Sequence, residues 1–299
     1  CLLRRQRQMC IRDSLHSNDR EVGSSFAVYK DGNPIIDIWG GFSDKEQKTE
    51  WKRNTLANVW STTKGVAAIA LAHAVEKGLL DYEEPVSKYW PEFGCNGKEE
   101  ITVGMLLSHQ AGICGSTATK AEDYYDQKIM SDELSQMTPI WEPGTASGYH
   151  SMTYGWLTSE LIIRITGKTL GNYFREEIAS PNEIDFYIGL PESEEYRVAE
   201  MIPFPKETNK SNNHLNEAKI ASAAGPNLLK HQNSRQWRAS EIPSANGQGC
   251  ASAIAKLYSL VVTSEESIKI LNDSTIRTMT KERITNRDLV LDVCLLYTS

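Results

Sequence analysis

The stretch from residue 60 to 78, W-S-T-T-K-G-V-A-A-I-A-L-A-H-A-V-E-K-G, constrains the fold of this chain more than any other. Apolar side chains fall on nearly every face between Val66 and Val75, and charge returns only at Glu76 and Lys77. A surface helix has one apolar face, whereas a helix that is apolar all round lies buried in a large domain. The stretch therefore predicts a central, buried helix.

The first turn of this helix is polar. Ser61 and Lys64 are three residues apart and share one face, at the helix end where free N–H groups favour negative charge. Burial favours the neutral amine of a lysine, which is the form that a general base needs. The pattern predicts that Lys64 activates Ser61 for attack on an acyl carbonyl. The structural alternative is a serine that caps the helix and a lysine that reaches the surface.

Composition narrows the class of protein. The chain has 299 residues, with 40% apolar and 24% charged residues, which is typical of a globular protein with one large domain or two intertwined ones. No apolar run approaches the roughly 20 residues of a membrane span. The net charge of -7 and the pI near 5.5 argue against nucleic acid as a partner.

The two ends and the cysteines bear on the chain's origin and compartment. Residues 1–14 and 294–299 both contain C-L-L and have neither a strand period nor a signal-peptide layout, so we interpret both as non-native, adapter-derived tails. Cys95, Cys114 and Cys250 remain, and their scatter predicts buried thiols rather than a disulfide framework or a metal cluster. We therefore expect a cytosolic protein.

The order of elements predicts an α+β fold. Two β-rich runs in residues 24–40 flank D-G-N-P, which is typical of an antiparallel hairpin. Helical patterns then follow, and no βαβ alternation interrupts them. They cover residues 103–109 behind the N-cap Thr102, then 153–167, 169–178, 251–262 and 264–283.

Residues 59–112, with V-W-S-T-T-K-G-V-A-A and I-T-V-G-M-L-L-S-H-Q-A-G-I, resemble the serine β-lactamase-related family. This family includes class C β-lactamases, D,D-peptidases and family VIII carboxylesterases. The resemblance extends over residues 20–293 and implies a β-lactamase/D,D-peptidase-like fold, in which an antiparallel sheet flanked by helices carries an inserted helical domain. We expect residues 15–61 and 181–293 to form the sheet domain, with C-terminal strands missing, and residues 62–180 to form the helical domain.

The family's second motif is Tyr-x-Asn, and the matching residues here are Tyr149, His150 and Ser151. The resemblance implies that Tyr149 is the acid/base for the leaving group and the water. Ser151 replaces an asparagine that helps to hold the amide of β-lactams, so its presence favours ester substrates. Tyr154 is a weaker candidate because only Tyr149 fits the Y-x-S frame. Trp60, His150 and Ser151 are the candidate substrate contacts.

The family's third motif, Lys-Thr-Gly or His-x-Gly, does not occur, which we interpret as truncation of the sequence. The oxyanion hole is then specified only by the Ser61 N–H. His109 suggests a Ser-His-Asp triad, but the chain has no G-x-S-x-G motif, and in this family the segment is structural. No H-E-x-x-H motif or paired cysteine spacing indicates a metal, and the chemistry needs no cofactor.

These features together predict a serine hydrolase that acts through an acyl-serine on small carboxylic esters. Two alternatives stay open: a β-lactamase or D,D-peptidase that acts on amides, and a catalytically inactive scaffold or fragment. If the protein is an enzyme of either kind, its binding partner is a small-molecule ester or amide substrate. The sequence leaves the acyl group, the alcohol and the oligomeric state open.

Overall fold

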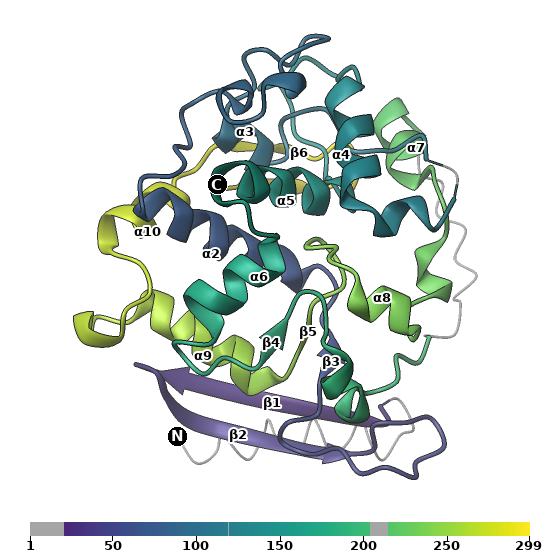
Figure 1. Cartoon of the computed structure of the whole chain (residues 1–299), viewed down its shortest axis with the longest axis vertical. Helices are drawn as coiled ribbons and strands as arrows, with labels where there is room; N and C mark the ends of the chain where they lie inside the picture. The colour runs from purple at the N-terminus through teal and green to yellow at the C-terminus, as the bar shows by residue number, and fades with distance from the viewer. Residues whose placement is uncertain (1–20, 119, 204–214) are drawn as a thin grey trace.

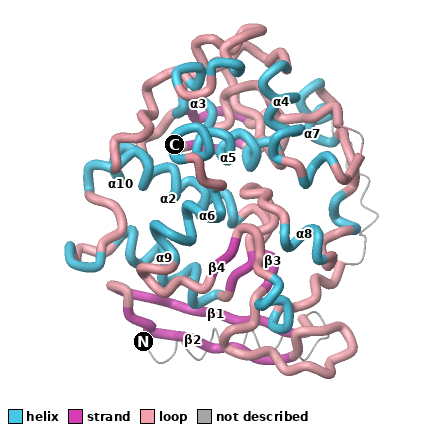
Figure 2. The backbone as a smooth tube through the Cα atoms, viewed as in Figure 1, coloured by secondary structure: helices cyan, strands magenta, loops and turns pink. Residues whose placement is uncertain are grey.

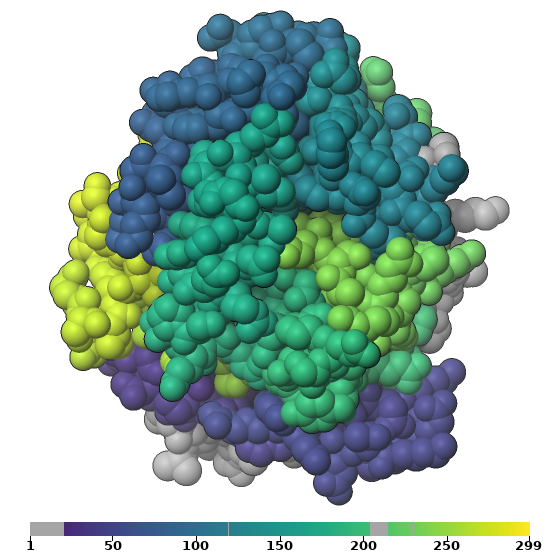
Figure 3. All heavy atoms as spheres, viewed as in Figure 1, coloured from purple at the N-terminus to yellow at the C-terminus, as the bar shows by residue number. Residues whose placement is uncertain are grey.

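The computed structural model describes residues 21–118, 120–203 and 215–299. Its central helix, α2 (Thr62–Glu76), is buried on nearly all sides, as the sequence predicts. Lys77 caps the C-terminus of this helix, and Gly78 follows with a left-handed φ of 71°. In the space-filling view, α5 and α6 lie over most of α2 (Figure 3).

Most of the predicted helices surround α2 and share one hydrophobic core with it (Figure 1). Thr102 caps α3 as predicted, because its side chain accepts the Met105 N–H at 3.1 Å. The helices that build this part of the molecule are α3 (Val103–Leu107), α4 (Gln127–Gln136), α5 (Thr153–Thr166), α6 (Leu170–Phe174) with a π-helical extension (Arg175–Ala179), and α10 (Asp273–Met279).

The predicted hairpin is formed by the antiparallel strands β1 (Gly23–Lys30) and β2 (Asn33–Gly41). Its turn is shorter than D-G-N-P, because only Asp31 and Gly32 form it, with φ of 48° and 71°. Two central residues with positive φ are typical of a tight hairpin turn. Helix α9 (Ala251–Val262) packs against β1, and the hairpin lies at one end of the molecule (Figures 1 and 2).

A small antiparallel sheet, whose first strand ends shortly before Ser61, is absent from the predictions. It has the order β3-β5-β4, with β3 (Ala57–Asn58), β4 (Phe186–Tyr187) and β5 (Gln248–Gly249). Two-residue strands are too short to show a period of two, which explains why the sequence does not reveal them. Two further short helices follow in the second half of the chain, namely α7 (Glu217–Ala223) and α8 (Arg235–Ala239).

The last strands are β6 (Ile284–Arg287) and β7 (Cys294–Tyr297), which pair antiparallel with Ile284 opposite Tyr297. Part of the segment that we interpret as a C-terminal tail is thus paired with the fold. The non-native origin of residues 294–299 stays a prediction, as do the two domain boundaries. The N-terminal segment 1–14 lies outside the described residues.

The described strands and helices confirm the α+β class. Strands gather in three separate antiparallel sheets, and helices cover them (Figure 2). Within the ranges given above, none of the helices has both the length and the apolar character that a bilayer span requires. Six short 3-10 helices complete the described fold: Val86–Lys88, Pro91–Phe93, Asp123–Tyr125, Glu192–Arg197, Leu228–Lys230 and Glu266–Ile268.

Candidate active site

Ser61 is exposed at the start of α2 and follows a strained residue. Trp60 has a φ of 48°, a left-handed conformation that is unusual for a bulky side chain and is frequent at functional sites. Thr63 fixes this turn, because its hydroxyl donates to Trp60 O at 2.5 Å and accepts the Gly247 N–H at 3.0 Å. The Ser61 side chain makes no capping bond to α2, which contradicts the structural alternative for this serine.

Lys64 is buried beside Ser61, with 8% of the residue exposed. Its Nζ lies 3.4 Å from Ser61 Oγ, 2.7 Å from Ser151 O and 2.9 Å from Ser244 O. Burial lowers the pKa of Lys64 to about 7. A neutral amine has two hydrogens, which the two carbonyls accept, so its lone pair is left for the Ser61 hydroxyl. This lysine does not reach the surface, and its amine is placed as a general base.

Tyr149 completes the group around Ser61. Its ring centroid lies 4.7 Å from Lys64 Nζ. Burial raises the pKa of the phenol, whereas a hydrogen bond with the Ser61 hydroxyl lowers it. Tyr154 lies farther away, with its ring centroid 5.9 Å from Lys64 Nζ and only 4% of the residue exposed. The structure therefore brings Tyr149 to Ser61 and keeps Tyr154 behind it.

His150 does not lie where a substrate contact requires it. The residue is fully buried, its Nε2 accepts the Ile113 N–H at 3.1 Å, and its Nδ1 lies 2.7 Å from Gly148 O. The proton is therefore on Nδ1, which donates to Gly148 O. Burial lowers the pKa of His150 to about 4, which keeps the ring neutral. Both nitrogens are used inside the protein, so this placement argues against the expected substrate contact.

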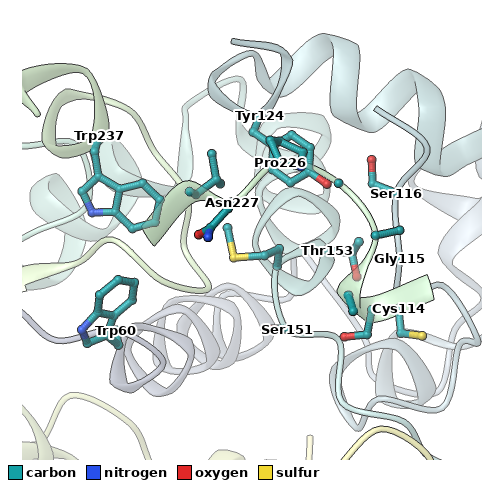
Figure 4. A pocket seen from close by; sticks show the side chains of 16 residues that line it. Trp60, Cys114, Gly115, Ser116, Tyr124, Ser151, Thr153, Pro226, Asn227 and Trp237 are labelled. Atoms are coloured by element: carbon teal, nitrogen blue, oxygen red, sulfur yellow. The ribbon is translucent and has the colours of Figure 1, made fainter. Parts of the chain in front are cut away.

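Trp60 and Ser151, the other two candidate contacts, both line a cavity of about 450 Å³ (Figure 4). Trp60 and Trp237 lie on one side of it, with ring centroids 5.8 Å apart, and Cys114 lies on the other. None of the described lining residues carries a formal charge. They are Trp60, Cys114, Gly115, Ser116, Tyr124, Ser151, Met152, Thr153, Ser222, Ala223, Ala224, Gly225, Pro226, Asn227, Leu228 and Trp237.

Two site residues escape the sequence analysis. Ser244 lies 180 residues from Lys64 in the sequence and holds the amine through its carbonyl oxygen. Trp237 forms a wall of the cavity, and its Nε1 donates to Asn58 Oδ1 at 2.9 Å. Turn chemistry in P-S-A-N-G at 243–247 is the only local signal for Ser244, and it does not indicate a contact with Lys64.

The Ser61 N–H is free to donate a hydrogen bond to an oxyanion. No hydrogen bond between the residues that the structure describes uses this group. A backbone N–H at a helix start is a suitable donor to the negative oxygen of a tetrahedral intermediate.

A cluster of three or more His, Cys, Asp or Glu side chains that could bind a metal is not found in the described ranges.

Comparisons with known proteins agree with this fold. The chain belongs to the Beta-lactamase family, whose model matches residues 11–293. It is similar to the esterase/beta-lactamase LipL of Mycobacterium tuberculosis, with 32% identity over 292 residues that cover 90% of this chain. The chain spans 66% of the length of LipL and less than half that of the Escherichia coli and Yersinia enterocolitica β-lactamases that it matches.

Solved structures give the same family. A crystal structure of a family VIII carboxylesterase superposes with a TM-score of 0.88 at 39% identity. EstA from Arthrobacter nitroguajacolicus Rue61a superposes with a TM-score of 0.84 at 32% identity. Each comparison covers 96% of this chain and 77% of the other. The predicted fold, an antiparallel sheet with helices in the β-lactamase arrangement, is thereby confirmed.

Proposed function

We propose that this protein is a serine hydrolase that cleaves small, uncharged carboxylic esters through an acyl-Ser61 intermediate. Lys64 takes the proton from Ser61 Oγ as the oxygen attacks the ester carbonyl, and the Ser61 N–H stabilises the resulting oxyanion. The alcohol leaves with a proton, and the acyl group stays on Ser61. Water then attacks the acyl carbonyl, which releases the acid and regenerates the serine.

The observation that carries this proposal is the position of the Lys64 amine. It lies 3.4 Å from Ser61 Oγ and is held by two carbonyl oxygens, and within the described residues no carboxylate forms an ion pair with it. A structural buried lysine is usually paired with an acidic group, which keeps it charged. Here burial alone shifts the pKa of Lys64 to about 7, close to the ideal value for a base at neutral pH.

Tyr149 serves the proton transfers that follow attack. The Tyr149 phenol lies beside Ser61, whose hydroxyl lowers the pKa of the phenol, so Tyr149 can pass a proton to the leaving alcohol and later accept one from the attacking water. The charge of a protonated Lys64, 4.7 Å from the ring, favours the phenolate that the second transfer needs. Lys64 and Tyr149 therefore act as a coupled acid/base pair.

The charge of the cavity favours esters over β-lactams and D-Ala-D-Ala peptides. Those amides carry a carboxylate, which is costly to bury without a cation. No cation is found among the described residues that line the cavity, whereas Trp60, Trp237 and Met152 offer apolar surface. Relatives described as carboxylesterases support this choice. Amide hydrolysis stays the second candidate because LipL is described as both esterase and β-lactamase.

A pair of chromogenic substrates tests the proposal. We expect the protein to hydrolyse p-nitrophenyl acetate and to leave the β-lactam nitrocefin largely intact. Ser61→Ala abolishes the ester hydrolysis, whereas Thr62→Ala, which removes the exposed neighbouring hydroxyl, preserves it. Ester hydrolysis that survives Ser61→Ala contradicts the proposal, and preferential cleavage of nitrocefin favours the second candidate. This pair of substrates does not test the cytosolic location, the lack of a nucleic-acid partner or the oligomeric state.

A further inference from the structure

The backbone around Tyr149 is held by three consecutive N–H groups. The Gly148 N–H donates to His109 O at 3.1 Å, the Tyr149 N–H donates to Asp288 Oδ1 at 3.2 Å, and the His150 N–H donates to His109 Nδ1 at 3.1 Å. His109 and Asp288 thus accept hydrogen bonds from the N–H of Tyr149 and from the N–H groups of the residues on either side of it. Buried backbone N–H groups are nearly always paired, and here two of the three acceptors are side-chain atoms, Asp288 Oδ1 and His109 Nδ1.

The two acceptor residues are themselves fixed. His109 is 5% exposed and adopts a left-handed φ of 62° just after α3, and its ring packs 5.1 Å from that of Tyr149. Asp288 is 1% exposed, and its Oδ1 also accepts the Val290 and Leu291 N–H groups at 2.9 and 2.7 Å. Both acceptors come from segments remote from Tyr149 in the sequence, so they set its position relative to the rest of the fold.

The hydrogen bond to His109 Nδ1 requires a neutral ring with its proton on Nε2. Burial, the largest cause, lowers the pKa of His109 well below its usual value. The ring therefore keeps its acceptor at neutral pH. This state distinguishes His109 from a catalytic base, because its lone pair is already used by the backbone.

We propose that His109 and Asp288 are positioning residues, which hold the Tyr149 hydroxyl at Ser61 through the backbone of residues 148–150. This inference rests on the proposed function of Tyr149 as the acid/base. A displacement of about 1 Å in a catalytic group can cost about 100-fold in rate, so the anchors of this backbone affect the chemical steps more than substrate binding.

Two substitutions at His109 separate its ring from its acceptor. His109→Phe keeps an aromatic ring beside Tyr149 but has no acceptor for the His150 N–H. His109→Asn keeps an acceptor and tolerates positive φ. With p-nitrophenyl acetate we expect kcat to fall about 10-fold or more in His109→Phe at unchanged KM, and His109→Asn to restore most of it.

A double-mutant cycle tests whether His109 acts through Tyr149. If it does, His109→Phe costs little further kcat when Tyr149→Phe is already present, because the group that it positions is gone. Independent effects that multiply in the double mutant overturn the proposal. His73→Phe is the matched control because it removes another buried histidine, which hydrogen-bonds Tyr173. His73 lies about 18 Å beyond Ser61 along α2, so we expect this variant to leave kcat unchanged.

Amide hydrogen exchange tests the positions without relying on activity. We expect the amides of residues 148–150 to exchange about 10-fold or more faster in His109→Phe and in Asp288→Ala than in the wild type, and His109→Asn to stay close to the wild type. Unchanged exchange in both loss variants overturns the inference. A wild type without Ser61-dependent hydrolysis instead overturns the proposed function, and the exchange result still decides whether His109 and Asp288 hold this backbone.

Discussion

The amine of Lys64 lies 3.4 Å from the hydroxyl oxygen of Ser61 and has both hydrogens of its neutral form engaged by main-chain oxygens. In the proposed mechanism, the α2 helix and the Ser244 loop thus hold the base in place before any substrate arrives. Proton transfer between Ser61 and Lys64 depends on the charge of Lys64. The transfer can therefore be tested by changing the pH and by mutation.

The first prediction concerns the pH dependence of hydrolysis. Burial lowers the pKa of Lys64 to about 7, so the amine is protonated below that pH and cannot accept the Ser61 proton. We expect kcat/KM for p-nitrophenyl acetate to fall about 10-fold per pH unit below about pH 7 and to level off above it. A steady-state pH profile checks this, and a profile that stays flat across this range contradicts a Lys64 base.

The second prediction distinguishes the two tyrosines. Tyr149→Phe removes the hydroxyl at Ser61, and we expect kcat to fall by about 100-fold to 10,000-fold, the range for loss of a general acid/base. Tyr154→Phe is the matched control because that ring lies deeper, with its centroid 5.9 Å from Lys64 Nζ. Steady-state kinetics of both variants decide the assignment, and a larger loss in Tyr154→Phe reverses it.

The third prediction concerns the acyl group. Two p-nitrophenyl esters of equal chain length, the hexanoate and the mono-ester of adipate, differ by one terminal carboxylate. Because the described cavity lining has no cation, burial of that carboxylate costs about 2 kcal/mol or more, and we expect kcat/KM to be at least about 30-fold lower for the adipate ester. Equal values for the two esters show that a charge is accommodated and contradict an uncharged acyl site.

The fourth prediction concerns stability in acid. Burial lowers the pKa of His150 from 6.5 to about 4 in the folded state, so between these values the unfolded chain binds more protons. Stability therefore falls as pH falls from about 6.5 to about 4, and His150 contributes about 2 kcal/mol of the loss between about pH 7 and pH 5.

Urea unfolding at these two pH values measures that contribution. In His150→Asn we expect the difference in the free energy of unfolding between the two pH values to shrink by a similar amount, because asparagine does not titrate. A difference equal to that of the wild type shows that His150 is not the titrating group.

The sequence predicts local features of this site well. The all-round apolar pattern of residues 60–78 predicts the buried helix, and the Ser61–Lys64 spacing predicts their common face, because helical geometry relates near neighbours in sequence. Tyr149 follows from the family resemblance rather than from any pattern in its own neighbourhood. Those three residues do come together in the structure.

Local sequence patterns do not predict contacts between segments that are far apart in the chain. Ser244 holds Lys64 across 180 residues, and nothing in its sequence neighbourhood indicates this contact. His150 shows the converse, because its place in the tyrosine motif suggests a substrate contact, whereas both ring nitrogens bond to the backbone of the protein. The two-residue strands β3, β4 and β5 also leave no sequence pattern, since their pairing joins segments far apart in the chain.

The central claim, that Ser61 forms an acyl-enzyme, is tested most directly by mass spectrometry of a trapped intermediate. Tyr149→Phe is mixed with p-nitrophenyl acetate and quenched in acid, and its peptides are analysed. Since this variant lacks the group that activates water, we expect one acetyl group on the peptide that contains Ser61 and none there in the Ser61→Ala/Tyr149→Phe double variant. An acetyl group on another residue during turnover, with Ser61 unmodified, contradicts the account.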